Sequence, residues 1–436
     1  MPERTGQRWC VLGGGILGMH LAKQLSQTGA RVTLCEAAPQ LGGLASAWRL
    51  GSFTWDRHYH VTLLSDMALR ALLTELGLEQ DLRWTKTRTG FFVGGKLCSM
   101  SNAVEFLRFP PIGLIDKFRL GATILYASRV TDWKRLEQIP VAEWLSKLSG
   151  ANTFEKVWRP LLLSKLGESY KDVSAAFIWT TISRLYAARR AGMKEELFGY
   201  LPGGYSRILD AFGKYLAGLG VDIRLNSPAR AVRRTPDGVS VAFGDGEGEV
   251  FDRVVMTTPA AAAAQVCQGL TPREIELLRG IRYQGIVCAS LVLTRPLGGY
   301  YVTNITDPGI PFTGVIEMSA LVDRSEFDGN HLVYLPKYVP PDDPAFAASD
   351  DELRREFTGG LRRMYPDLAD DQIAAFQVSR ARHVFALPTI GYSDRLPPVR
   401  TSVPGLYILN SAHIVNGTLN VNETLLLAQR YLEQLV

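Results

Sequence analysis

The chain has 436 residues, of which 46% are hydrophobic and 21% charged, and its formal net charge is +5 at pH 7. These proportions are typical of a globular soluble protein, and the length is sufficient for two domains. The charge is spread along the chain without a block of like charges, which argues against a nucleic-acid partner. The five cysteines have no C-x-x-C spacing, which predicts a protein without disulfides or a metal site. No apolar segment precedes the first expected strand, and no apolar run is long enough to span a membrane. We therefore expect a cytoplasmic protein without a signal peptide.

The first forty residues carry a nucleotide-binding pattern. It consists of Trp9–Leu12, the turn Gly13-x-Gly15-x-x-Gly18, a helical stretch from Ile16 and Leu17 to Gln27, Val32–Cys35, and the pair Glu36-Ala37. This is the strand–turn–helix–strand order of a dinucleotide-binding βαβ unit. Gly13 permits the tight turn, Gly15 lets the backbone approach a pyrophosphate, and Gly18 lets the helix pack against the strand. The helix N-terminus attracts phosphates, and Glu36 can accept hydrogen bonds from an adenosine ribose.

A second pattern follows at residues 42–60. Gly42-Gly43-Leu44 is a flexible turn able to pass over a cofactor, Arg49 follows it, and the segment Trp55-Asp56-Arg57-His58-Tyr59-His60 comes next. These motifs resemble the flavoprotein superfamily of amine oxidases, protoporphyrinogen oxidases, carotenoid desaturases and UDP-galactopyranose mutases. In that superfamily the last segment resembles F-D-x-G-x-H and runs beside the flavin, and here His58 replaces the glycine. The resemblance therefore implies cofactor contacts from Arg49 and residues 58–60, with His58 and His60 as the catalytic candidates.

The middle of the chain predicts a helical region. A helix is expected over 65–78, a two-stranded hairpin over 89–100, and helices from 102 to 194. Residues 109–130 mix basic and large apolar side chains, so they either lie on a membrane surface, wall a substrate pocket, or form a helical subdomain with solvated basic faces; we favour the last. Residues 157–165 resemble the superfamily's helical cap, where Arg159 and Lys165 would meet an anionic substrate.

The second half of the chain contains further motifs that resemble those of the superfamily, in the same order along the chain. A Pro-Gly-Gly turn at 202–204 precedes an expected helix over 206–219 and a strand over 221–225. Strands are also expected over 286–294 and 331–335, a helix over 350–365, and a final strand, loop and helix after 404. The resemblance implies that Ala231 and Val232 contact the adenine ring and that Thr257, Thr258 and Pro259 contact the diphosphate. It also implies that Asn410 and Ser411 contact the ribityl–phosphate arm. Leu419, Asn420 and Val421 would contact the pyrimidine edge of the flavin.

Together these motifs predict an α/β fold. We expect a discontinuous Rossmann-like FAD-binding domain of the glutathione-reductase type, formed by residues 1–88, 200–280 and 396–436. An inserted α+β substrate domain with a helical cap would comprise residues 89–199 and 281–395. The cofactor expected is FAD rather than NAD, because NAD enzymes lack the GG turn and the C-terminal segment.

The predicted activity is removal of a hydride, or two electrons, from a C–H or CH–NH bond of a small organic substrate, for which an apolar, isoprenoid-like or porphyrinogen-like compound is one option. Oxygen or a quinone-like compound would reoxidise the flavin. The resemblance disfavours amine oxidation, because that branch of the superfamily usually carries a lysine near the flavin N5 on the strand that matches residues 281–294, and these residues contain no lysine. Isoprenoid desaturation or porphyrinogen oxidation would favour peripheral membrane contact, and a UDP-galactopyranose-mutase-like isomerase is the main alternative. Rab-escort and GDP-dissociation-inhibitor proteins, which share the fold without flavin, represent a non-enzymatic alternative.

Overall fold

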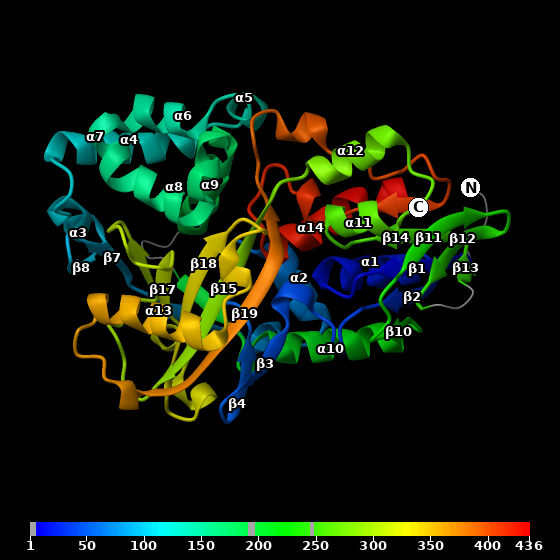
Figure 1. Ribbon diagram of the computed structural model, residues 1–436, viewed down its shortest axis with the longest axis horizontal. Helices are drawn as coiled ribbons and strands as arrows, with labels where there is room; N and C mark the ends of the chain where they lie inside the picture. Colours follow the sequence, from blue (N-terminus) through cyan, green and yellow to red (C-terminus); the bar gives the residue numbers. More distant parts are fainter. Residues whose placement is uncertain (1–5, 191–196, 245–247) are drawn as a thin grey trace.

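Two β-sheets, one parallel and one mixed, organise the chain (Figure 1). The structure is a computed structural model that describes residues 6–190, 197–244 and 248–436. The parallel sheet lies on the right of Figure 1, the mixed sheet on the left, and a group of helices covers the upper left. This is a mixed α/β fold, as the sequence predicts.

The parallel sheet has five strands in the order β10-β2-β1-β14-β20. Their bounds are Arg8–Leu12 (β1), Arg31–Cys35 (β2), Asp222–Arg224 (β10), Arg253–Met256 (β14) and Leu406–Ile408 (β20). Four of the five residues of β1 are buried, as expected for a strand covered on both faces. The predicted strands at 9–12, 32–35 and 221–225 are therefore confirmed, and strands separated by nearly 400 residues share one carboxyl edge.

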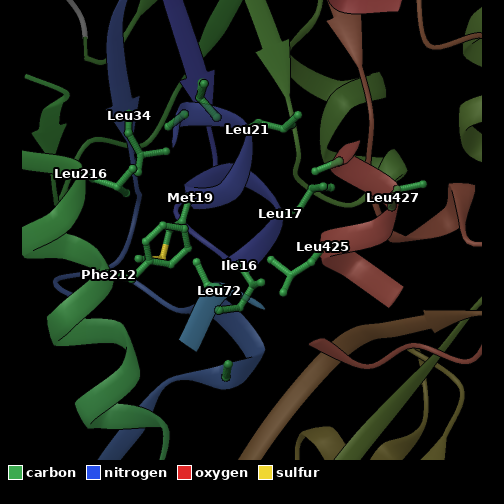
Figure 2. Packing of buried hydrophobic residues seen from close by; sticks show 14 of the residues in the cluster. Ile16, Leu17, Met19, Leu21, Leu34, Leu72, Phe212, Leu216, Leu425 and Leu427 are labelled. Carbon is green, nitrogen blue, oxygen red and sulfur yellow. The ribbon is translucent and has the colours of Figure 1, made fainter. Parts of the chain in front are cut away.

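The core beside this sheet is built by helices from distant parts of the chain. They are α1 (Ile16–Gln27), α2 (Met67–Glu75), α10 (Gly204–Gly218) and α14 (Val421–Leu435). Figure 2 shows Met19 of α1 against Phe212 of α10, and Leu17 against Leu425 of α14. These side chains are almost completely removed from water, so burial of the apolar helix faces holds the glycine turn in place.

The mixed sheet has seven strands in the order β19-β15-β18-β17-β16-β7-β8. The bounds are Thr89–Val93 (β7), Lys96–Ser99 (β8), Tyr283–Leu293 (β15), Val302–Ile305 (β16), Gly314–Glu317 (β17), His331–Val339 (β18) and Ile373–Ala386 (β19). Helix α13 (Asp350–Met364) buries Phe357 and Leu361 in the apolar cluster under this sheet. The expected hairpin at 89–100 and the expected helix at 350–365 are confirmed.

Smaller elements connect the two sheets. The hairpin of β3 (Ala47–Leu50) and β4 (Phe53–Asp56) leads into a three-stranded sheet of β5 (Thr62–Leu63), β9 (Leu197–Tyr200) and β6 (Arg83–Lys86). A further antiparallel sheet comprises β11 (Ala231–Thr235), β12 (Gly238–Ala242) and β13 (Glu249–Phe251), and α11 (Ala260–Val266) and α12 (Pro272–Gly280) follow β14. The predicted domain boundaries themselves stay a prediction.

The helical region is confirmed as far as residue 190, and residues 191–194 lie outside the described part of the chain. Its helices are α3 (Ala103–Arg108), α4 (Leu114–Ala127), α5 (Trp133–Leu136), α6 (Val141–Ser149), α7 (Ala151–Thr153), α8 (Arg159–Leu166) and α9 (Ala175–Arg190). The expectation of solvated basic faces holds only in part for α4. Arg119 is exposed but Lys117 is buried, and large apolar side chains dominate the exposed face, with Leu114, Ile115 and Phe118 exposed by 73%, 79% and 80%.

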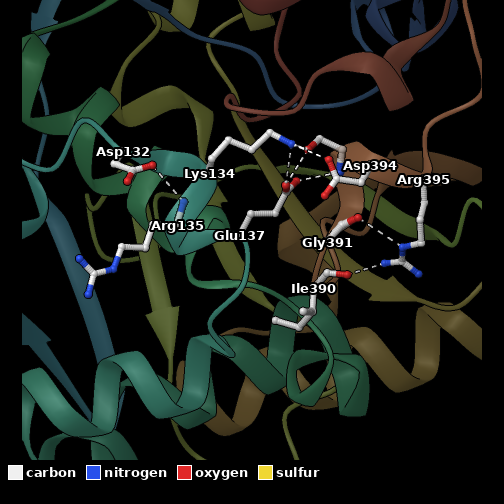
Figure 3. A network of polar contacts seen from close by, with 9 residues as sticks. Asp132, Lys134, Arg135, Glu137, Ile390, Gly391, Asp394 and Arg395 are labelled. Atoms are coloured by element: carbon white, nitrogen blue, oxygen red, sulfur yellow. Dashed lines mark hydrogen bonds and ion pairs between the residues drawn. The ribbon is translucent and has the colours of Figure 1, made fainter.

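A polar network fastens this helical region to the segment that returns to the parallel sheet (Figure 3). The Glu137 carboxylate, which is almost fully buried, accepts hydrogen bonds from the Ser393 amide at 2.8 Å and the Ser393 hydroxyl at 2.6 Å. Lys134 donates to Asp394 at 2.8 Å. Buried carboxylates are retained where donors compensate their lost hydration, so this contact fixes the helical region in position.

Candidate functional site

The three glycines of the first turn have different surroundings. A Cβ atom at Gly13, whose φ is +115°, would lie 2.5 Å from the Thr257 hydroxyl oxygen. A Cβ atom at Gly18 would lie 1.8 Å from the carbonyl oxygen of Gly13, whereas one at Gly15 would have the Gly43 Cα, at 4.0 Å, as its nearest neighbour. Gly13 and Gly18 are therefore required by the protein's own packing. Gly15 faces open space and so allows a ligand to approach.

Helix α1 begins at this open position without a side-chain cap. Its N-cap is Gly15, and its first turn contains no acidic residue. The Ile16 and Leu17 side chains are buried in the core, so these two residues offer only their backbone to a ligand. Unpaired N–H groups at a helix N-terminus, together with the helix dipole, form an anion site.

Glu36 lies at the end of β2, next to this turn. Its carboxylate accepts hydrogen bonds from the Gly14 amide at 2.6 Å and the Ala38 amide at 2.8 Å. Ala37 is exposed and Glu36 is half-buried. The carboxylate is thus held at a fixed position beside the turn, while part of its surface remains accessible.

The second glycine turn is bound to the first. The Gly42 amide donates to the Gly14 carbonyl at 2.8 Å, and both Gly42 and Gly43 adopt positive φ angles of +117° and +56°. Gly43 is exposed and Leu44 is half-buried beside it. Arg49 behaves differently: it lies exposed on the β3–β4 hairpin, and its guanidinium donates to the Gly51 carbonyl at 3.2 Å. The structure therefore does not bring Arg49 to the glycine turn.

The predicted residues 257–259 and 410–411 lie at the carboxyl edge of the parallel sheet. The Thr257 hydroxyl donates to the Leu12 carbonyl at 3.0 Å, and Pro259 is the N-cap of α11. The Asn410 amide donates to the Thr258 carbonyl at 3.0 Å, which joins the ends of β14 and β20, and Ser411 follows, half-buried. These residues meet beside Gly13, as the motif order predicts.

The remaining predicted residues sit on either side of this edge. The carbonyl of Val232 already accepts a hydrogen bond from the Gln268 amide at 2.8 Å, and Ala231 is half-buried. Leu419 and Val421 flank the N-cap of α14, Asn420, whose side chain accepts from the Glu423 amide at 2.9 Å. A cavity of about 250 Å³ lies between this helix start and α9. The cofactor roles of these residues stay predictions.

The segment 55–60 connects the two sheets. The buried Asp56 carboxylate accepts from the Tyr205 amide at 2.8 Å and therefore caps the start of α10. Its second oxygen lies 3.4 Å from Nδ1 of His60, whose ring centroid is 4.5 Å from that of Tyr205. Asp56 thus orients the His60 ring.

His58 and Tyr59 point toward the mixed sheet. Nε2 of His58 lies 3.2 Å from the Ser379 hydroxyl, and the Tyr59 hydroxyl lies 3.0 Å from the Tyr338 hydroxyl. Burial, with smaller contributions from His60 and Arg57, lowers the pKa of His58 to about 3, so its ring is neutral at pH 7. Burial raises the pKa of Tyr59 to about 12, so its hydroxyl keeps its proton.

Five buried polar groups on the predicted site segments have no hydrogen-bond partner within the described chain. They are Trp48 Nε1, Trp55 Nε1, Arg57 Nε, His58 Nδ1 and Thr258 Oγ1. A buried polar group without a partner costs roughly 1–3 kcal/mol, so such a group usually marks a ligand or water position. Sequence reasoning did not single out Arg57 or Tyr338, which the structure places beside the predicted residues. Arg57 could have been found as the basic residue inside the second motif, whereas nothing near Tyr338 in the sequence signals its role.

Comparison with known proteins identifies the family. The model of the family described as flavin-containing amine oxidoreductase matches residues 18–420. The chain belongs to this family. It is therefore a flavoprotein oxidoreductase, and the predicted superfamily membership is confirmed.

Individual members of the flavin-containing amine oxidoreductase family show the same likeness. The chain is 25% identical to a coproporphyrinogen III oxidase from Mycobacterium bovis, over 92% of this chain and 91% of that protein. It is 26% identical to a carotenoid phi-ring synthase from Streptomyces griseus, over 91% and 81%. Among solved structures, a putative protoporphyrinogen oxidase from Exiguobacterium sp. 255-15 matches with a TM-score of 0.78 and 19% identity, over 99% and 98% of the two chains.

The residues present fit the flavin that this family contains. The uncapped start of α1, the open side of Gly15 and the buried groups without partners are the features that a phosphate-bearing cofactor needs. Within the described ranges, no group of three or more His, Cys, Asp or Glu side chains could hold a metal ion, and no helix is long and apolar enough to cross a membrane.

Proposed function

We propose that the chain binds FAD and oxidises a small, apolar organic substrate at a C–H or CH–NH bond. Bound flavin would accept the two electrons as a hydride and pass them to oxygen or a quinone-like acceptor. The observation that carries the proposal is the position of residues 55–60. They follow the Gly42-Gly43 turn on one side and contact the mixed sheet through Ser379 and Tyr338 on the other.

The chain's own residues would position the substrate and the cofactor. Asp56 fixes the ring of His60, so that the remaining ring nitrogen can hold or move a proton at the substrate. His58 is neutral and can donate or accept one hydrogen bond without adding charge. We propose His60 and His58 as the catalytic pair on this basis. The predicted arrangement of a discontinuous FAD domain and an inserted substrate domain is consistent with the two sheets.

Anaerobic flavin bleaching tests this function. The purified protein should be yellow and release FAD on denaturation, and its visible absorbance should be lost with one class among amines, porphyrinogens and isoprenoids. A colourless protein that takes up no FAD would contradict the cofactor proposal. A flavin that none of these compounds reduces would contradict the proposed reaction.

A flavin-dependent isomerase acting on a nucleotide sugar is the second candidate. The observation that favours it is a group of tyrosines: half-buried Tyr59 contacts half-buried Tyr338 through the hydroxyls, and its ring centroid lies 6.3 Å from that of the buried Tyr334. Reduction by dithionite alone, followed by turnover of UDP-galactopyranose and of no oxidisable compound, would select the isomerase.

We further propose that the α3–α4 face rests on an anionic membrane surface. This face consists of Val104, Leu107, Leu114, Ile115, Phe118, Leu125 and Tyr126, all exposed. Arg108, Arg119 and Arg129 are exposed around it. The two acids of residues 102–130 are hydrogen-bonded to neighbouring residues, since Glu105 accepts from Ser99 and Ser101, and Asp116 accepts from Asn152. An apolar face with a basic rim matches an anionic bilayer in both hydrophobicity and charge.

Vesicle cosedimentation tests this contact. Vesicles of phosphatidylcholine with one quarter phosphatidylglycerol should bind the protein better than phosphatidylcholine alone, and the double variant I115S/F118S should lose at least tenfold in binding. Leu225→Ser, which changes an exposed apolar residue of the parallel-sheet region, is the matched control. Absence of binding to both vesicles, or a dimer that the double variant dissociates, would overturn the proposal.

A further inference from the structure

Lys165 is a half-buried cation that has no anionic partner among the residues the structure describes. It lies on α8, which packs on β18, and its ammonium nitrogen is 5.5 Å from the ring centroid of Tyr338 and 5.9 Å from that of Phe385. Within the described chain it makes no hydrogen bond or ion pair, and part of its surface remains accessible. A half-buried lysine without a hydrogen-bond or ion-pair partner loses part of its hydration without a counter-charge, which calls for a reason outside the described chain.

Within residues 6–190, 197–244 and 248–436, the charges around Lys165 do not supply that partner. Desolvation lowers its pKa, and the nearby positive charge of Arg184 lowers the pKa further, with no carboxylate acting in the opposite direction. Arg184 is itself paired with Asp66 at 3.2 Å, and Asp66 also accepts from the Leu63 amide at 2.8 Å. The Asp66 carboxylate, which pairs with Arg184, therefore already has its own partners.

Lys165 is connected to the site through aromatic side chains. The Tyr338 ring below its ammonium group carries the hydroxyl that contacts Tyr59, the residue between His58 and His60. Phe385 stacks on Phe177 of α9 with 6.4 Å between ring centroids and an interplanar angle of 14°. The lysine thus stands at the end of an apolar wall that begins at the predicted flavin-facing segment.

We propose that Lys165 binds a carboxylate group of the substrate, whose apolar body lies along the wall of Tyr338 and Phe385. The substrate class is then an apolar or aromatic organic acid. An incoming carboxylate supplies the counter-charge that the described residues do not provide, and in a poorly hydrated site such an ion pair is worth more than at the surface. The inference rests on the proposed function, because it takes residues 55–60 to be the reacting end of the site.

Binding of two matched fluorescent probes tests the proposal without turnover. Pyrenebutyrate and pyrenebutanol share an apolar body and differ in the carboxylate, and their Kd values can be measured by fluorescence anisotropy on the FAD-loaded protein. The parent should prefer the acid at least tenfold, Lys165→Met should reduce this preference to near one, and Lys165→Arg should keep most of it. Lys156→Met, at an exposed lysine of the same helical region, should behave as the parent.

The opposite results would overturn the proposal. A parent without preference for the acid, or a K165M variant that keeps the preference, removes the carboxylate role. Because the methionine variant no longer buries a charge, its Tm without probe should equal or exceed that of the parent; a lower Tm with unchanged probe preference would identify a purely structural lysine. The protein could prefer pyrenebutyrate in a Lys165-dependent way while no compound reduces its flavin. That result would contradict the proposed oxidation but leave the carboxylate site intact.

Discussion

Substitution of two glycines in one turn by alanine should have opposite consequences for folding and for cofactor binding. At Gly18 the added methyl group would lie 1.8 Å from the Gly13 carbonyl oxygen, about half a normal contact distance, so the helix must move away from the strand. Overpacking of this kind costs about 1–3 kcal/mol or more. Gly18→Ala should therefore lower the Tm of the protein whether or not FAD is present.

At Gly15 the same methyl group meets no protein atom closer than 4.0 Å, and the backbone angles φ −71° and ψ 174° suit alanine. The free energy of unfolding of the apoprotein should stay the same or rise by about 0.4–1 kcal/mol. The methyl group would, however, occupy the space proposed for the cofactor diphosphate. A cost of about 1–3 kcal/mol there corresponds to roughly 5- to 150-fold weaker FAD binding.

The assay combines two measurements on each variant. Thermal unfolding of the apoprotein gives the effect on the fold, and titration with FAD, followed by flavin fluorescence, gives the dissociation constant. Gly121→Ala on α4, where an added Cβ meets nothing within 4 Å, is the control and should leave FAD binding unchanged. Parent-like FAD binding by Gly15→Ala would refute the diphosphate position, and a parent-like Tm for Gly18→Ala would refute the close helix–strand contact.

Three further predictions concern titratable residues of the site. His60→Ala should keep FAD bound but slow flavin reduction in anaerobic stopped-flow, because the ring held by Asp56 is lost; reduction as fast as in the parent would contradict its role. Glu36→Ala should lower flavin occupancy after extensive dialysis, and unchanged occupancy would count against the ribose contact. The pKa of His58 is about 3 in the folded protein and near 6.5 in the unfolded chain. Between about pH 6.5 and pH 3 the unfolded state therefore binds more protons than the folded state, so the free energy of unfolding should fall as the pH drops through this range. His58→Gln should flatten this part of the curve of unfolding free energy against pH, and an unchanged slope would assign the acid sensitivity to another group.

The amino-acid sequence by itself determined the local elements and the family. The glycine turn, the GG turn and the order of the later motifs depend on residues close together in the chain, where backbone conformation and helix or strand periodicity decide the outcome. The strands at 9–12 and 32–35 and the amphipathic helix at 350–365 are found where those patterns predict them. The family membership predicted from the same motifs is confirmed over residues 18–420.

The tertiary structure alone decided which side chains share a site and which face water. Arg49 matched the motif but lies on an exposed hairpin, whereas Arg57 carries the buried nitrogen without a partner. Large apolar side chains dominate the exposed face of α4, because which side of a helix packs depends on its neighbours and not on its composition. Lys165 meets Tyr338 and Phe385, which lie more than 170 residues away in sequence. Such contacts arise from the pairing of distant strands and helices, and no local pattern encodes them.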